Sequence, residues 1–185
     1  MRPSFSIIIP AKNRAHTIAQ TLKTIFEQPF KDFEVILSDD FSEDGTESLI
    51  NQFKTNPNFV FTRPKETGMM NNFEHSISMS NGRYLIVLGG DDGLLPDSLS
   101  QLQQIIQKEN HKIITWPTPA FFYPGLRSES SFLTIPTESF NKTNIKKISS
   151  AKFLDNQFKN LFYIGDKYNP MIYVKSAIAR DLVKE

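Results

Sequence analysis

The chain has 185 residues, with 21 Lys and Arg against 20 Asp and Glu, no Cys and 39% hydrophobic residues. This length is typical of one domain, and the apolar content excludes a disordered chain. A net charge of +1 disfavours a protein that binds nucleic acid through a broad basic surface. The absence of Cys excludes disulfides, thiolate metal sites and a Cys nucleophile.

The chain begins with a predicted strand and helix. Residues 4–10 form a short, β-branched apolar run that ends at Pro10, which is typical of a buried strand in a parallel sheet. The following apolar residues recur with the spacing of one helix face and stop before Pro29: Ile18, Leu22, Ile25 and Phe26.

The same alternation continues through two further pairs. Residues 33–38 predict a second buried strand, followed by a polar loop over 39–45 and a short helix. That helix carries Leu49, Ile50 and Phe53 on one side. Residues 59–62 predict a third strand. A helix with an apolar face then follows and is expected to end at an Asn81-Gly82 cap: Met70, Phe73 and Ile77.

Residues 84–88 and 113–116 predict two more strands, separated by a helix that starts at Pro96-Asp97. The inward residues of that helix are Leu99, Leu102, Ile105 and Ile106. Alternating strands and helices with short connections predict an α/β fold, a doubly wound and mostly parallel sheet with helices on both faces.

The pattern changes after residue 116. Residues 117–148 are rich in Pro, Ser, Thr and Phe and predict loops, with one short strand at 132–135. A helix over 149–162, a strand over 171–174 and a helix over 176–184 complete the expected elements. We therefore expect a first half, 1–116, and a second half, 117–185.

Neither a signal peptide nor a membrane span is expected. The apolar run at the N-terminus is too short for a signal peptide, and no stretch approaches 18 apolar residues. A cytoplasmic location follows as the default expectation.

Polar residues follow the first, second and fourth predicted strands: residues 10–14, 39–46 and 89–93. Ligands of open α/β sheets bind at the carboxyl ends of the strands, so these clusters are expected at one edge. Asp91 and Asp92, flanked by glycines, offer the carboxylate oxygens that Mg²⁺ and Mn²⁺ prefer. The alternative is a plain Asp-Gly turn.

The pair Asp39-Asp40 has two interpretations as well. The residues Asp44-Gly45-Thr46 predict a turn that leads into a helix cap, which explains the polar loop but not the pair at the strand end. A carboxylate at that place could accept a hydrogen bond from a base N–H or a ribose hydroxyl. The motifs of serine hydrolases, Walker-type phosphate loops and Rossmann phosphate loops are absent from the sequence.

Together the segments SIIIPAKNR, FEVILSDDFSEDGT and NGRYLIVLGGDDGLLPDSL, within residues 4–103, resemble the family 2 glycosyltransferases, which have the GT-A fold. The resemblance implies transfer of a sugar, with inversion, from a nucleotide-sugar donor, commonly a UDP-sugar, to a glycan or glycolipid acceptor. It implies metal ligands for Mn²⁺ or Mg²⁺ at Asp91 and Asp92. It also implies a set of nucleotide-binding residues: Pro10, Ala11, Lys12, Arg14, Asp39, Asp40, Arg63, Asn72, Gly90 and Asp91. Asp40 would contact the base, and Asp39 would shape the loop.

The sequence departs from the family pattern at three places in this site. Gly89 replaces the first acid of the metal motif, and Lys12 stands where an aromatic residue often stacks on the base. In the segment 68–80, where the family often has an Arg, this chain has Asn71-Asn72-Phe73. The family's catalytic base lies on the acceptor side, where Asp166 is the candidate within this chain. We expect the true base to lie beyond residue 185, in a longer protein that associates peripherally with a membrane.

Three other functions compete with this interpretation. A nucleotidyltransferase can have the same type of sheet and metal site, but residues 10–14 lack the glycine-rich loop that holds a triphosphate. A receiver-type signalling module needs an Asp after the third strand, and residues 59–63 contain none. A degenerate relative that binds a nucleotide without turnover also agrees with the loss of an acid at Gly89.

Overall fold

The computed structural model describes residues 2–109, 112–115, 120–122, 132–134 and 176–182. The chain divides into two compact units, residues 1–115 with 172–185 and residues 116–171. The predicted helix at 149–162, the predicted strand at 171–174 and Asp166 lie outside the described residues.

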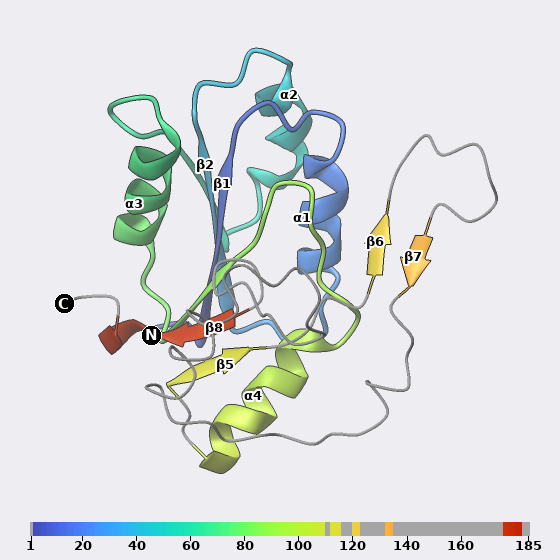
Figure 1. The fold of residues 1–185 in the computed structure, drawn as a ribbon, viewed down its shortest axis with the longest axis vertical. Helices are drawn as coiled ribbons and strands as arrows, with labels where there is room; N and C mark the ends of the chain where they lie inside the picture. Colours follow the sequence, from blue (N-terminus) through green and yellow to red (C-terminus); the bar gives the residue numbers. More distant parts are fainter. Residues whose placement is uncertain (1, 110–111, 116–119, 123–131, 135–175, 183–185) are drawn as a thin grey trace, which may run out of the picture. The chain divides into compact units, whose positions relative to one another are not determined.

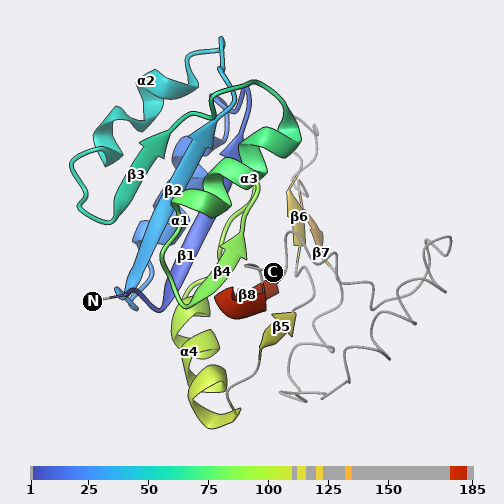
Figure 2. The same ribbon diagram turned by 90° about the vertical axis from the view of Figure 1, so that its left-hand side faces the viewer.

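The first unit is built on a twisted sheet (Figures 1 and 2). Its strands are β1 (Phe5–Ala11), β2 (Phe33–Asp39), β3 (Phe59–Thr62), β4 (Tyr84–Val87), β5 (Ile113–Thr115) and β8 (Ser176–Ala179). They follow the order β3-β2-β1-β4-β8-β5. β1 pairs in parallel with β2 and β4, and β2 pairs in parallel with β3, whereas β8 is antiparallel to β4 and β5. The prediction of a mostly parallel sheet is confirmed.

Helices cover both faces of this sheet, as predicted. They are α1 (Ile18–Phe26), α2 (Thr46–Ile50), the 3₁₀ helix η1 (Asn51–Phe53), α3 (Met69–Met79), α4 (Ser98–Glu109) and the 3₁₀ helix η3 (Arg180–Leu182). α3 contacts β1 and β2 from one face, and α1 and α2 lie together on the other (Figures 1 and 2).

The core lies between these layers and explains the continuous apolar runs of the central strands. The side chains at 7–9 in β1 and 35–37 in β2 are fully buried, because both faces of each strand are covered. From α1, the predicted residues Ile18, Leu22 and Ile25 are also fully buried. Each such side chain contributes about 1.5–3 kcal/mol through removal of apolar surface from water.

The helix α3 buries a polar face, which corrects the prediction from its apolar residues. Met70 is exposed and Phe73 and Ile77 are half-buried, whereas Asn72 and Ser76 are buried. Asn72 donates hydrogen bonds to carbonyls at the ends of β1 and β2. Because buried carbonyls must be hydrogen-bonded, this polar side chain faces the sheet although the apolar spacing predicts another face. In the preceding helix, Leu49 is likewise exposed.

The end of α3 also differs from the expected glycine cap. The helix ends at Ser80, which has an extended conformation, and Gly82 has no positive φ. Gly82 serves close packing instead, because a Cβ there would lie 2.4 Å from the backbone N of Ser6.

Residues 176–179 form a strand where the sequence predicted a helix over 176–184. β8 pairs with β4 along one edge and with β5 along the other, so sheet pairing overrides the helix propensity of its alanines. In the second unit, β7 (Phe132–Thr134) matches the strand expected at 132–135, and its antiparallel partner β6 (Ala120–Phe122) was not predicted.

None of the helices in the described part of the chain has the length and apolar character to cross a bilayer.

Candidate functional site

The polar clusters that follow the parallel strands lie at one edge of the sheet, as the sequence predicted. The loops after β1 and β2 meet at the upper end of Figure 1, where the N–H of Asp40 donates to the carbonyl of Ala11 over 2.8 Å. The register explains this, because Ala11 is paired with Asp39 at the ends of β1 and β2. The loop after β4 reaches the same edge, where Oδ2 of Asp91 lies 3.7 Å from Nε of Arg14 in the loop after β1.

Asp40 is a buried carboxylate at this edge that bonds to residues of two other loops. It is 4% exposed, and its Oδ1 accepts hydrogen bonds from the Thr67 hydroxyl at 2.8 Å and the Gly68 N–H at 2.9 Å. The ammonium of Lys12 lies 3.2 Å from Oδ2. Burial alone would raise the pKa of Asp40, but the bonds from Gly68, Thr67 and Lys12 together lower it below its ordinary value. Asp40 is therefore a charged group at neutral pH.

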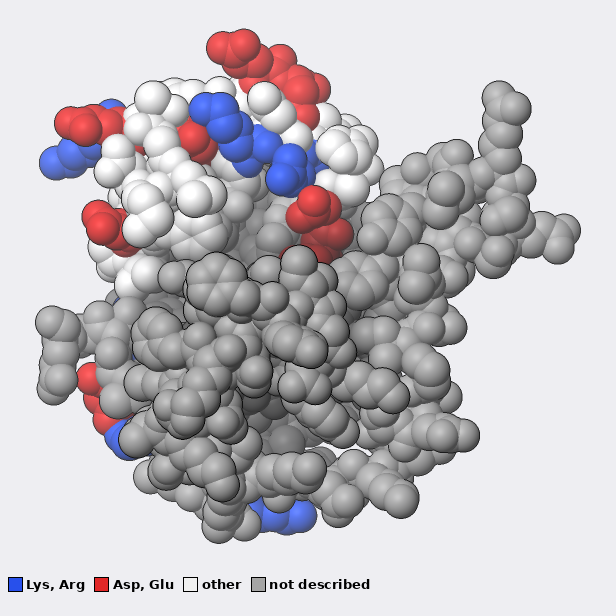
Figure 3. All heavy atoms as spheres, viewed as in Figure 1, with Lys and Arg blue, Asp and Glu red and all other residues white. Residues whose placement is uncertain are grey.

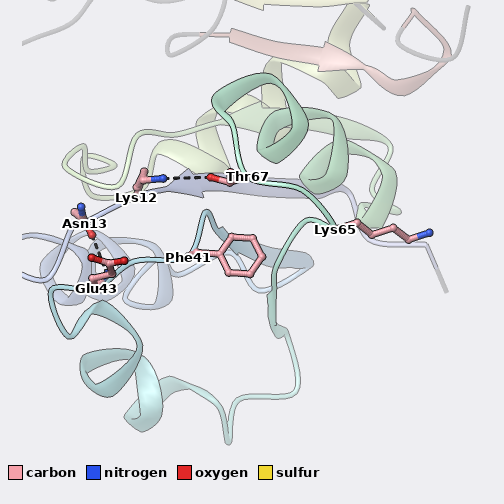
Figure 4. A pocket seen from close by; sticks show the side chains of 6 residues that line it. All are labelled: Lys12, Asn13, Phe41, Glu43, Lys65 and Thr67. Atoms are coloured by element: carbon pink, nitrogen blue, oxygen red, sulfur yellow. Dashed lines mark hydrogen bonds between the residues drawn. The ribbon is translucent and has the colours of Figure 1, made fainter.

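Two of these partners of Asp40, Lys12 and Thr67, line a pocket of about 480 Å³ (Figure 4). Its lining residues come from the loops after β1, β2 and β3: Lys12, Asn13, Phe41, Glu43, Lys65 and Thr67. Figure 4 shows the ammonium of Lys12 reaching toward Thr67, and the two groups are 3.3 Å apart. The volume falls in the range of small-molecule sites.

Asp39 shapes the loop after β2, as expected. Its side chain is fully buried, and Oδ2 accepts bonds from the Ser42 N–H and from Nε of Arg63, both at 3.1 Å. Within the described residues, Oδ1 of Asp39 is buried without a hydrogen-bond partner. Arg63 also donates to Glu47 over 2.8 Å, and the bonds to Asp39 and Glu47 raise its pKa further. Arg63 is thus bonded to one acid at the end of β2 and to one acid of α2.

Asn72 of α3 is bonded to the ends of β1 and β2. Its amide nitrogen donates to the carbonyls of Ala11 and Ser38 over 3.3 and 3.0 Å, and its oxygen accepts a bond from the Ser38 hydroxyl. Asn72 is 3% exposed, so these buried hydrogen bonds hold the ends of β1 and β2 together. Pro10 and Ala11 occupy the last two positions of β1 in the same layer.

The second part of the edge is the acidic loop after β4. Oδ2 of Asp92 accepts a hydrogen bond from the Gly89 N–H at 3.1 Å, and Oδ2 of Asp91 lies 3.7 Å from Nε of Arg14. A Cβ at Gly89 would lie 2.6 Å from Oδ2 of Asp92, so a side chain there would crowd the two acids.

These residues meet the minimal requirement of a hard cation. Mg²⁺ and Mn²⁺ take oxygen ligands, and one or two carboxylates suffice when substrate phosphates and waters supply the rest. No group of three or more His, Cys, Asp or Glu suited to a metal occurs among the described residues. Asp91 and Asp92 therefore fit a cation shared with a phosphate better than a site made by protein alone.

Several residues of the site were missed from the sequence. Thr67 and Gly68 bind Asp40, and the Thr17 and Thr21 hydroxyls hold the carbonyl of Gly90 at 2.9 and 3.2 Å. Because β3 is parallel to β2, the loop after β3 begins at the same sheet edge, and this could have indicated Thr67 as a site residue. Figure 3 shows basic and acidic side chains intermixed over the described atoms at the upper end of the molecule.

The comparison with protein-family models agrees with this geometry. The model described as "Glycosyl transferase family 2" matches residues 6–168, most of the chain. The chain belongs to this family.

Individual relatives match over shorter segments. The chain is 31% identical over 105 residues to the GalNAc(5)-diNAcBac-PP-undecaprenol beta-1,3-glucosyltransferase of Campylobacter jejuni, covering 55% of this chain and 34% of the relative. The chain therefore spans about a third of the length of this curated relative.

Three solved structures of two glycosyltransferases show the same fold. S. aureus TarS 1–349 aligns with a TM-score of 0.70 and 16% identity over 98% of this chain and 48% of TarS 1–349. Its complex with UDP-GlcNAc aligns over 66% and 36% of the two chains, with a TM-score of 0.58 and 20% identity. The mannosyltransferase PcManGT from Pyrobaculum calidifontis, in complex with GDP-Man and Mn²⁺, gives a TM-score of 0.56 and 22% identity over 64% and 37%. These structures confirm the predicted GT-A-like fold.

Proposed function

We propose that this chain forms the donor-binding part of an enzyme that transfers a sugar from a nucleoside diphosphate sugar, with inversion, to a glycan or glycolipid acceptor. The observation that carries the proposal is the joint placement of two features at one sheet edge. A pocket lies beside the buried carboxylate of Asp40, and the Asp91-Asp92 pair follows β4. Membership of family 2 supports it.

The pocket beside Asp40 would hold the base. A carboxylate has about four lone-pair sites, and three of those on Asp40 take bonds from Gly68, Thr67 and Lys12. Within the described part of the chain, one site on Oδ2 is left for a base N–H, and one N–H of Lys12 is left for a base acceptor. Lys12 is 52% exposed, so its alkyl stem can cover one side of a bound ring.

The loops near Asp91 and Asp92 would hold the diphosphate. These two acids would bind Mn²⁺ or Mg²⁺, which when present neutralises negative charge on the departing nucleoside diphosphate. The carbonyl of Gly90 is fixed by Thr17 and Thr21, so the acids are presented on a loop that is tied to α1. This fixed placement reduces the ordering cost of donor binding.

The acceptor side of the proposal depends on the relatives. The name of the Campylobacter relative gives a polyprenyl diphosphate glycan as its substrate, and this supports a glycolipid acceptor for this chain. Deprotonation of the acceptor hydroxyl needs a carboxylate base. Asp166 remains the candidate within this chain, and a cytoplasmic, peripherally membrane-associated enzyme remains the proposal for the whole protein.

Calorimetric titration tests the donor site. We expect UDP to bind in the presence of Mn²⁺, with a marked loss of affinity in EDTA and in Asp92→Ala. Glu27→Ala is the matched control, because Glu27 is an exposed acid at the end of α1 that pairs with Lys23. UDP, GDP and CDP are compared in parallel to identify the base. A folded wild-type protein that binds none of the three would contradict the proposal.

One observation favours a second candidate, a nucleotide-binding relative without turnover. Gly89 stands in place of an acid, and the described residues contain no group of three His, Cys, Asp or Glu that could hold a metal. Nucleotide binding without release of UDP from UDP-sugars, measured with a range of acceptors and with Mn²⁺ present, would support this candidate over the enzyme.

A further inference from the structure

A second pocket, the arginine pocket, lies at the other end of the sheet, near the starts of β1 and β4. It has a volume of about 570 Å³, and its lining includes Arg2, Glu34, Ser80, Asn81 and Arg180. β1 has seven residues and a length of about 20 Å, which separates this pocket from the loops after β1 and β2 (Figure 1). The arginine pocket is therefore distinct from the proposed donor site.

Arg180 is a buried cation in the lining of this pocket. It is 9% exposed, and burial is the main reason why its pKa is lowered from the ordinary value. Both terminal nitrogens of its guanidinium donate to a single neutral acceptor, the hydroxyl oxygen of Ser80, at 3.0 Å. The acids in the described part of the chain form no ion pair with Arg180. Because buried charges are normally paired, this guanidinium calls for a counter-charge.

Arg2 adds a second cation to the pocket. Its Nε and Nη2 donate to the carbonyls of Asn81 and Gly82 at 2.7 and 3.1 Å, so the guanidinium is held by neutral backbone atoms. Among the ion pairs of the described residues, none includes Arg2. Its charge also contributes to the lowered pKa of Arg180. The two like charges thus repel each other, and an anion between them would remove that repulsion.

Glu34 supplies the negative charge of the pocket lining, but its bonds go to other groups. Its Oε1 accepts hydrogen bonds from the hydroxyl of Ser6 and from the N–H groups of Asn81 and Gly82. Glu34 raises the pKa of Arg180 by less than burial and Arg2 together lower it. Two guanidiniums against one carboxylate leave the lining with a net charge of 2 − 1 = +1. The pocket therefore favours an anion.

A phosphoryl group fits the donors that this pocket offers. A guanidinium has five N–H donors. Two of those on Arg180 go to Ser80 and two on Arg2 go to carbonyls, so within the described residues each arginine keeps three. The planar guanidinium forms charge-assisted, bidentate bonds with phosphate oxygens. A phosphoryl group presents three such oxygens, enough for both arginines, whereas a carboxylate presents two.

We propose that Arg2 and Arg180 bind a phosphoryl group in the arginine pocket, carried by a lipid headgroup or by a soluble molecule. The ligand would connect three segments that are far apart in sequence: the residues before β1, the loop between α3 and β4, and η3 after β8. Since a ligand of the folded state stabilises it, binding here would strengthen the attachment of β8 to the sheet. The inference goes beyond the proposed function and shares no residue with the donor site.

Calorimetric titration of inorganic phosphate in EDTA tests the site. We expect the wild type to bind phosphate and Arg2→Gln to bind it about tenfold or more weakly, because charge-assisted bonds are lost. Arg2 is exposed, so this variant should fold. Arg180→Lys keeps the charge but loses the planar fork, and it should also weaken binding. Arg83→Gln is the matched control, since Arg83 is an exposed arginine before β4 and outside the pocket lining, and it should leave the affinity unchanged.

Vesicles distinguish the two sources of the phosphoryl group. The wild type and Arg2→Gln are sedimented with phosphatidylcholine vesicles that contain phosphatidic acid and with vesicles of phosphatidylcholine alone. Capture that requires both phosphatidic acid and Arg2 supports a lipid headgroup. Binding of inorganic phosphate without capture by vesicles supports a soluble ligand.

Three results would overturn the inference. A folded wild type that binds neither phosphate nor phosphatidic acid refutes the site, whatever the outcome of the UDP titration. Equal losses in Arg2→Gln and Arg83→Gln mean that phosphate is attracted by surface charge without a defined site. A loss in Lys12→Gln but not in Arg2→Gln places the phosphate at the donor edge. If Arg180→Lys does not fold, Arg2→Gln and its control decide.

Discussion

Asp40→Asn is the most informative single change at this sheet edge. The Gly68 N–H and the Thr67 hydroxyl would bond to a neutral amide oxygen, and the ammonium of Lys12 would face an amide that offers no charge. Bonds to a charged acceptor contribute about 1 kcal/mol more than bonds to a neutral one. The half-exposed Lys12 contributes at most about 1 kcal/mol. Relief of carboxylate burial offsets part of the loss, so we expect a destabilisation of about 1–2 kcal/mol at pH 7.

The pH dependence identifies the charge as the cause. The pKa of Asp40 is lowered in the folded protein, whereas an unfolded Asp titrates near about 3.9. The stabilisation from the ionised form is therefore complete above about pH 4 and is lost as the pH falls through the lowered folded-state pKa. Asparagine does not titrate. The difference in unfolding free energy between wild type and Asp40→Asn should therefore shrink as the pH falls below 4.

Urea unfolding at pH 7, 5 and 3 measures this difference. At pH 7 the variant should also melt several degrees lower, since 1 kcal/mol corresponds to about 2–4 °C in a protein of this size. Glu27→Gln, at an exposed acid of α1, is the control and should stay within about 0.5 kcal/mol of wild type at each pH. A difference between wild type and Asp40→Asn that is the same at pH 7 and pH 3 would refute the reasoning.

Three further substitutions test the scaffold and the acidic loop. Gly82→Ala should cost about 3 kcal/mol or more in urea unfolding, because the new Cβ would lie 2.4 Å from the backbone N of Ser6; a cost below 1 kcal/mol would contradict this packing. Asn72→Ala should cost about 2–3 kcal/mol, because two buried strand-end carbonyls lose their side-chain donor, and an unchanged urea midpoint would count against that role. Gly89→Asp should lower the melting temperature in EDTA through crowding with Asp92, and Mn²⁺ should raise it by more than in the wild type; an equal Mn²⁺ response would show that the third acid does not reach the cation.

The central sheet and the meeting of its polar clusters could be predicted from the sequence. The apolar runs of β1 and β2 are long enough to identify strands covered on both faces, and parallel strands place residues 39–40 and 91–92 at one edge. These features depend on local pattern and on topology alone.

The errors arose where contacts between distant segments decide the structure. In α3 the buried Asn72 follows from strand-end carbonyls that lie 34 and 61 residues away in sequence, which its own helical period does not reveal. Thr67 reaches Asp40 across 27 residues. The small residues of β8 favour a helix by local propensity, but pairing with both β4 and β5 makes this segment a strand.

The position of β8 between β4 and β5 has a consequence for synthesis of the chain. Strands β1 to β4 can pair as soon as residue 87 leaves the ribosome, but β4 and β5 cannot be joined until residues 176–179 have been made. At about 5–20 residues per second, the edge of β4 waits several seconds for its partner. An unpaired strand edge can pair with another chain and cause aggregation. The edge of β4 therefore needs protection in the nascent chain, although it is covered by β8 in the folded protein.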